Sequence, residues 1–98
     1  MESANEVHYG GGFVRDARKI PKQAQEKLAT LIVFLTNDVF DHRLHTKRLD
    51  SPLQDVFAFR ITRGWRVGFI FIASHSIKLL AVDDRGQIYQ KLKRLLQR

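Results

Sequence analysis

Apolar residues in the first half of the chain recur at helical spacing. Five of them fall at i, i+4, i+7, i+8 and i+11: Ala24, Leu28, Leu31, Ile32 and Leu35. This stripe predicts a helix that opens at Pro21, ends near Asn37 and Asp38, and packs one face against the rest of the fold. A shorter helix over residues 13–19 precedes it and stops before Pro21, because the residue before a proline is pushed out of the helical region.

From residue 56 the pattern changes to a period of two, which is typical of β-strands. We expect three strands joined by short turns into an antiparallel meander, over residues 56–62, 65–72 and 77–82. If Phe57 and Phe59 face the helices, Arg60 lies on the opposite face of its strand. Arg66 then joins Arg60 across the hairpin, so that two guanidinium groups share one concave surface.

The two ends of the chain complete the predicted fold. Residues 1–5 are expected to fray, residues 6–9 to form a short strand, and the glycines at 10–12 to end it. Tyr89, Leu92 and Leu95 recur at helical spacing among basic residues, which predicts a short basic helix at the C-terminus. The sequence therefore indicates an α+β fold: two N-terminal helices packed on a mostly antiparallel four-stranded sheet, followed by that helix.

Length and charge narrow the class of protein. The 98 residues suit one small domain spanning 1–98, and the absence of cysteine excludes a disulfide framework. Neither a signal peptide nor a membrane span is evident, so we expect a cytoplasmic protein. Residues 1–50 carry 8 basic and 7 acidic side chains and residues 51–98 carry 9 and 3, so a net +6 falls on the second half. A localised positive face suits a polyanion or an acidic protein partner.

Several kinds of chemistry have little support. His42 and His45 are spaced like metal ligands, but a solvated loop explains them better, and we expect no metal and no cofactor. The glycines at 10–12 lack the lysine and spacing of a phosphate-binding loop. Ser74 and Ser76 flank His75 in a predicted turn, which is a better account of them than a catalytic triad.

The remaining candidates are cations and one tyrosine: Lys47, Arg48, Arg60, Arg63, Arg66, Arg85 and Tyr89. Arginines clustered on one face can hold phosphate bidentately and stabilise charge that develops on phosphorus. RNA supplies its own nucleophile, the 2′-hydroxyl, so its cleavage needs neither a metal nor a protein nucleophile. The alternative is that these arginines are ordinary solvated side chains on strands.

The segments LHTKRLDSPLQDVFAFRITRGWRVGFIF and IKLLAVDDRGQIY, with FVRDARKIPKQAQEKL before them, resemble the RelE branch of the RelE/ParE toxin superfamily. The resemblance covers residues 13–89. It implies a toxin that cuts messenger RNA in the decoding site of the ribosome and is neutralised by a cognate antitoxin, which we expect to be acidic. Neither a membrane nor a small-molecule cofactor is implied.

The resemblance also assigns roles to particular residues. Arg60, Arg66 and Arg85 would hold and stabilise the scissile phosphate, and Tyr89 would stack on a base or assist deprotonation of the 2′-hydroxyl. Lys47, Arg48 and Arg63 are expected to contact RNA. The chain departs from the family at Asp83 and Asp84, where close relatives have glycine and histidine.

Other functions remain open on this scaffold. A ParE-like inhibitor of DNA gyrase would share the fold, but such chains generally lack the clustered cations and the terminal tyrosine. An inactive relic that only binds antitoxin is a second alternative, because Asp83 and Asp84 could neutralise Arg85 through an ion pair. A generic nucleic-acid binder would bind with strong salt dependence and would need no ribosome.

Overall fold

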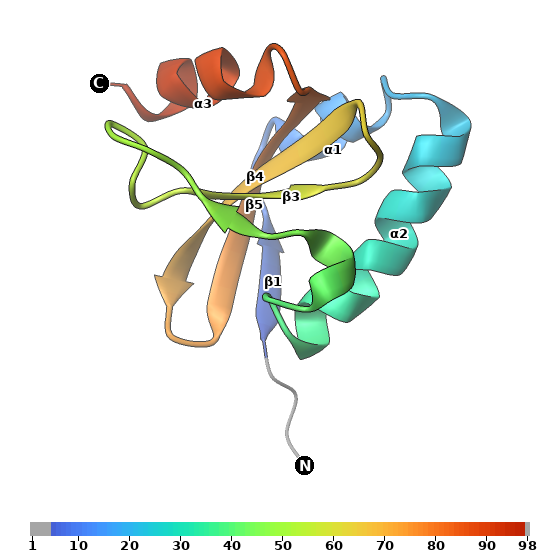
Figure 1. Cartoon of the computed structure of the whole chain (residues 1–98), viewed down its shortest axis with the longest axis horizontal. Helices are drawn as coiled ribbons and strands as arrows, with labels where there is room; N and C mark the ends of the chain where they lie inside the picture. The colour runs from blue at the N-terminus through green and yellow to red at the C-terminus, as the bar shows by residue number, and fades with distance from the viewer. Residues whose placement is uncertain (1–4, 98) are drawn as a thin grey trace.

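The computed structural model describes residues 5–97, which form one sheet with helices on both of its faces (Figure 1). The strands are β1 (Glu6–Tyr9), β2 (Lys47–Arg48), β3 (Phe57–Arg60), β4 (Trp65–Ala73) and β5 (Ser76–Asp84). The helices are α1 (Phe13–Ala17), α2 (Lys22–Asn37), the short 3₁₀ helix η1 (His42–Leu44) and α3 (Ile88–Leu96). No helix within these residues is long and apolar enough to span a membrane.

The sheet has five strands in the order β1-β5-β4-β3-β2, which confirms the α+β class but corrects the predicted strand number. β3, β4 and β5 form the expected antiparallel meander, and β1 runs parallel to β5. The strand that the sequence pattern missed is β2, whose two residues pair with Phe57 and Ala58. Both β2 residues are basic and exposed, so they carry no apolar alternation from which a strand could be predicted.

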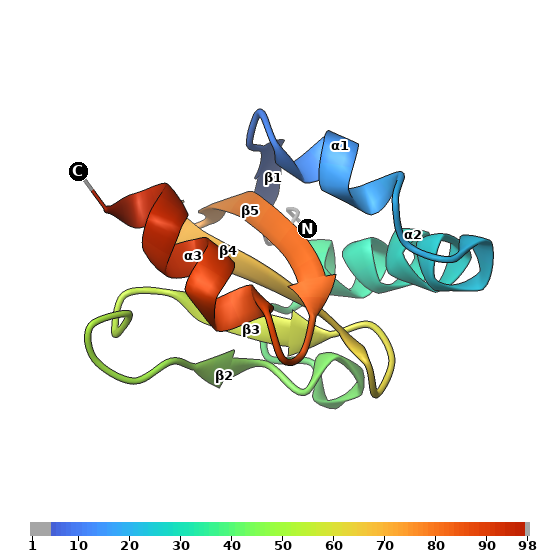
Figure 2. The same ribbon diagram turned by 90° about the horizontal axis from the view of Figure 1, so that it is seen from above.

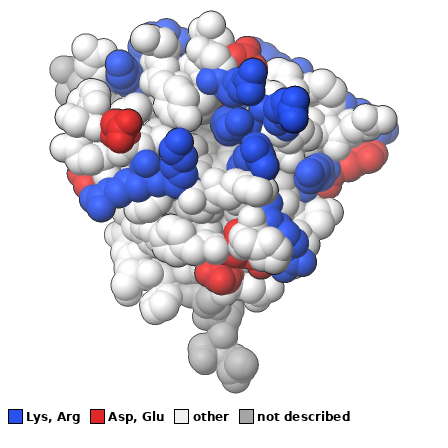
Figure 3. All heavy atoms as spheres, viewed as in Figure 1, with Lys and Arg blue, Asp and Glu red and all other residues white. Residues whose placement is uncertain are grey.

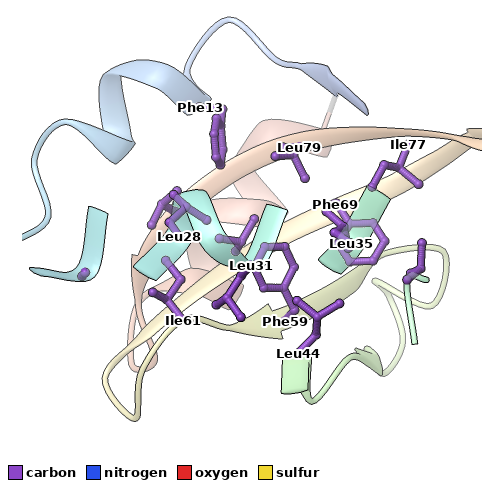
Figure 4. Packing of buried hydrophobic residues seen from close by; sticks show 14 of the residues in the cluster. Phe13, Leu28, Leu31, Leu35, Leu44, Phe59, Ile61, Phe69, Ile77 and Leu79 are labelled. Atoms are coloured by element: carbon purple, nitrogen blue, oxygen red, sulfur yellow. The ribbon is translucent and has the colours of Figure 1, made fainter. Parts of the chain in front are cut away.

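Helices α1 and α2 cover one face of the sheet, and α3 covers the other (Figure 2). The larger core lies under α1 and α2, where the stripe of α2 meets Phe59 and Phe69 (Figure 4). A smaller core on the opposite face joins Ile88 and Leu92 of α3 to the loop after β2. The second core fixes α3 beside the strand face that carries Arg60 and Arg66.

Close packing brings α3 onto β4 at Gly68. A Cβ atom at this position would lie 2.6 Å from both Cδ atoms of Leu92, whose side chain is fully buried. Only a residue without a side chain allows the helix this close to the strand. Gly68 therefore sets the height of α3, and of the side chains it carries, above the sheet.

Several element ends differ from the prediction. α1 ends at Ala17 rather than at residue 19, and the Lys19 N–H donates to the Asp16 carbonyl in a tighter turn. β5 continues to Asp84 because Asp83 and Asp84 pair with Arg66 and Trp65 of β4. The predicted fraying of residues 1–5 concerns residues 1–4, which lie outside the described residues, and Asn5, whose backbone N–H donates to the Thr36 carbonyl at 2.9 Å.

Candidate active site

Two arginines face each other across the β3–β4 hairpin. Arg60 and Arg66 are direct partners in the antiparallel register, and their strand neighbours Phe59 and Val67 are buried under α1 and α2. Because side chains alternate along a strand, both arginines lie on the α3 face of the sheet. This is the placement that the alternating pattern predicts.

Carbonyl oxygens of the β3–β4 turn hold the Arg66 guanidinium in place. Its Nη1 donates to the carbonyls of Thr62 and Arg63, each at 2.8 Å. Within residues 5–97, Nε and Nη2 donate no hydrogen bond, so this edge of the guanidinium is available to a ligand. An arginine anchored on one side can present two parallel N–H groups to a phosphate.

The surroundings of Arg66 are electropositive. Burial lowers the pKa of Arg66, the positive charges of Arg60 and Arg85 lower it further, and Tyr89 acts in the opposite direction. Arginine stays protonated at any working pH, so these effects describe crowded positive charge rather than a neutral side chain. A bound anion would relieve this repulsion.

An open hollow of about 220 Å³, here called the central hollow, lies where these groups meet. It is lined by His45, Lys47, Ala58, Phe59, Arg60, Arg66 and Tyr89. Tyr89 stands in the first turn of α3, and 39% of the residue is exposed. Three of the four predicted catalytic residues, Arg60, Arg66 and Tyr89, therefore converge on one hollow from three different elements.

The fourth, Arg85, lies beside this hollow rather than in its lining. Arg85 follows β5 in the turn that leads to α3, and its backbone N–H donates to the Gly64 carbonyl at 2.9 Å. Its charge nevertheless acts on Arg66. The side chain of Arg85 thus contributes to the positive field at the edge of the central hollow.

The predicted RNA contacts separate into different settings. Lys47 lines both the central hollow and an adjoining hollow of about 330 Å³ between the loop after β2 and α3, here called the loop hollow. Arg63 lines a third hollow together with Arg60. Arg48 lines the loop hollow, but its Nε donates to the Gln54 carbonyl at 2.6 Å, so this guanidinium also organises the loop.

His45 is a site residue that the sequence pattern assigned to a solvated loop rather than to the site. It adopts a left-handed backbone conformation with φ 55° at the end of η1, which is uncommon for a residue other than glycine. Leu44 on one side is fully buried, and the Thr46 hydroxyl on the other donates to the Val39 carbonyl at 2.6 Å. These anchors place His45 at the central hollow. The available signal was its position two residues before Lys47.

The carboxylates of Asp83 and Asp84 form no ion pair with Arg85. The Asp83 carboxylate accepts the Asp84 N–H and lies 3.7 Å from Lys91 Nζ, and the Asp84 carboxylate accepts the Gly86 N–H at 2.8 Å. Among the described residues, no carboxylate forms an ion pair with Arg60, Arg66 or Arg85. The ion pair on which the inactive-relic alternative depended is absent from this part of the chain.

On the face of the molecule that carries β2 and β3, Lys and Arg side chains gather around a hollowed region with few acidic groups among them (Figure 3). The described residues contain no group of three or more His, Cys, Asp or Glu side chains arranged to hold a metal ion. The arrangement of this face suits the binding of a phosphate chain.

Several solved structures with the same architecture are toxins or toxin–antitoxin complexes. The RelE toxin in a RelB–RelE antitoxin–toxin complex from Methanococcus jannaschii is 19% identical, with a TM-score of 0.70 over 87% of this chain and 98% of that one. The chain has the RelE fold. YafQ from E. coli strain BL21(DE3) has a TM-score of 0.71 at 15% identity, over 87% and 98% of the two chains.

A YoeB/ParE toxin from Agrobacterium tumefaciens shares the RelE fold too, with a TM-score of 0.69 at 14% identity over 82% of this chain and 98% of that one. No protein-family model and no curated protein sequence matches the chain. At these identities the likeness concerns the fold, and the function must be argued from the site.

Proposed function

We propose that this protein is the toxin of a type II toxin–antitoxin system and cleaves messenger RNA in the decoding site of the ribosome without a metal. The observation that carries the proposal is the convergence of Arg60, Arg66, Tyr89 and His45 on the central hollow. The RelE fold that the chain shares with toxins supports the assignment.

In the proposed reaction the 2′-hydroxyl oxygen bonds to the adjacent phosphorus while the bond from phosphorus to the 5′-oxygen breaks. The hydroxyl loses its proton to a base, and the departing oxygen takes one up. Arg60 and Arg66 bind the phosphate and stabilise the charge of the five-coordinate phosphorus, and Arg85 adds to the positive field. The products are a 2′,3′-cyclic phosphate and a free 5′-hydroxyl.

His45 and Tyr89 are the proton-transfer candidates of the central hollow. An imidazole exchanges protons near neutral pH, which the guanidinium groups cannot do. Tyr89 either stacks on a base beside the scissile phosphate or assists deprotonation of the 2′-hydroxyl. Close relatives in the family that the sequence resembles have a histidine at the position of Asp84. In this proposal His45 takes over the proton transfer of that histidine.

The ribosome and its message are the proposed targets, which would place the protein in the cytoplasm. The proposed antitoxin is acidic and covers the positive face, because complementary charge favours such a pair. The RelE protein of Methanococcus jannaschii was solved with its antitoxin RelB, which supports a partner of this kind.

The test is cleavage of a defined message on purified ribosomes with an empty decoding site, followed by mapping of the RNA ends. We expect new ends inside the decoding-site codon that require ribosomes and are lost in Arg66→Ala. Because Tyr89→Phe keeps the ring and loses the hydroxyl, strongly reduced cleavage assigns Tyr89 to deprotonation, and retained cleavage assigns it to stacking on a base. Lys22→Ala is the matched control, since it removes an exposed charge on α2. Absence of ends with folded wild-type protein contradicts the nuclease, and a gyrase supercoiling assay then tests the ParE-like alternative.

A further inference from the structure

Asp16 is the only charged side chain among the described residues that is buried, with 8% of the residue exposed. It lies on α1, on the opposite side of the sheet from the central hollow, and the proposed reaction does not use it. A buried carboxylate is costly unless it is paired and hydrogen-bonded. Its partners therefore show what Asp16 does.

The first partner is the open edge of β5. β1 pairs with β5 only as far as Leu79, so the edge beyond that residue has no neighbouring strand. The Asp16 carboxylate occupies this place, and its Oδ2 accepts the Val82 N–H at 3.2 Å. The side chain thus satisfies a backbone donor that a longer β1 would have satisfied.

The second partner comes from the other face of the sheet. Lys91 of α3 reaches the same edge, and its Nζ lies 2.9 Å from Asp16 Oδ1 and 3.7 Å from Asp83 Oδ2. Figure 2 shows α1 and α3 on opposite sides of β5, so this ion pair joins the two helical layers around the edge of the sheet. We call the Asp16–Lys91 pair the edge clasp.

The edge clasp acts on the same helix that carries Tyr89. Residues two positions apart on an α-helix point roughly 200° apart, so Lys91 and Tyr89 project from nearly opposite sides of α3. Ile88 and Leu92 lie one turn apart and point into the smaller core, on the side of the helix between Lys91 and Tyr89. Leu92 sets the height of α3 above Gly68, and the clasp restrains the rotation of the helix about its axis.

We propose that Asp16 and Lys91 are positioning residues that hold Tyr89 in the central hollow by clasping α3 to the edge of β5. The consequence for catalysis rests on the proposed function, whereas the consequence for the orientation of Tyr89 does not. Breaking the clasp releases Tyr89 while Arg60 and Arg66, which stand on the sheet, stay in place.

The chain has two tyrosines, Tyr9 and Tyr89, so ring NMR signals report on Tyr89 directly, with Tyr9→Phe to assign them. In Lys91→Met we expect the Tyr89 ring signals to move toward those of a free tyrosine and those of Tyr9 to stay. The hydrogen-exchange rate of the backbone amides of α3 should rise by about tenfold. Lys91→Arg should restore both readouts. The matched control is Arg94→Met, which removes an exposed charge from the same helix.

In the ribosome assay, Lys91→Met should lower kcat by about tenfold with little change in KM, because Tyr89 is misplaced while phosphate binding by the sheet arginines is intact. If Lys91→Met leaves the Tyr89 signals and α3 exchange as in Arg94→Met, the clasp does not position Tyr89 and the proposal is wrong. If these readouts change as expected but wild-type protein cuts no RNA, the positioning stands and the nuclease assignment fails.

Discussion

The contact between Gly68 and Leu92 gives a quantitative prediction for Gly68→Ala. The added methyl carbon would lie 2.6 Å from both Cδ atoms of Leu92, at least 0.8 Å inside the 3.4 Å at which ordinary contact begins. Leu92 is fully buried and cannot swing into solvent. Overpacking of this kind costs about 1–3 kcal/mol, which for a domain of this size lowers the melting temperature by roughly 4–8 °C per kcal/mol.

Leu92→Ala alone should cost about 2–5 kcal/mol, because it leaves a cavity under α3. In the double variant the methyl group added at position 68 enters the space that the leucine side chain vacates. We therefore expect the double variant to lose less than the sum of the two single losses, by about 1 kcal/mol or more.

Urea unfolding of the wild type, the two single variants and the double variant measures the coupling free energy between positions 68 and 92. Gly64→Ala is the matched control, because a Cβ atom there would meet nothing within 4 Å, and it should change the free energy of unfolding by less than about 1 kcal/mol. Additive losses, or a Gly68→Ala loss no larger than that of Gly64→Ala, would refute the packing of α3 onto β4.

Three further predictions concern the site and its supports. Arg66→Lys keeps the charge but loses the two-pronged contact, so cleavage on ribosomes should slow by about 10²–10³-fold; an unchanged rate would contradict phosphate binding by Arg66. Lys47→Met should weaken binding to a short RNA and make that binding less dependent on salt, with no change in the urea midpoint. Arg48→Met should lower the urea midpoint, because it releases the Gln54 carbonyl that the Arg48 side chain holds. The side chain and backbone N–H of Arg43 hold the pKa of Asp41 well below its usual range, so this carboxylate stabilises the fold above the aspartate pKa of about 3.9 and loses that effect as pH falls; the difference in urea midpoint between wild type and Asp41→Asn should be present at pH 7 and shrink by pH 3.

Features that depend on local periodicity could be predicted from the sequence. The stripe of α2 and the alternation from Phe57 to Phe71 identified the helix, the meander and the strand face of Arg60 and Arg66, because side-chain direction repeats every 3.6 or 2 residues. The last helix and its Tyr89 followed from the same rule.

Features that depend on contacts between distant segments could not be predicted in this way. β2 exists because Lys47 and Arg48 find β3 as a partner, and His45 lines the central hollow because its two neighbours are anchored elsewhere in the fold. Asp83 and Asp84 looked like partners for Arg85 in the sequence, but in the fold their carboxylates accept the backbone N–H groups of Asp84 and Gly86, and Asp83 also lies near Lys91.

Asp16 of the edge clasp shows, in one residue, the difference between what the sequence predicts and what the fold decides. In the sequence Asp16 is an ordinary acidic residue on a short helix, and nothing near it indicates burial. It becomes a structural partner of Lys91 only because β1 ends early and leaves the edge of β5 open between α1 and α3. The sequence by itself determined which faces the elements present, through short-range geometry. The tertiary structure decided which of those faces meet, because packing and desolvation act between residues far apart in the chain.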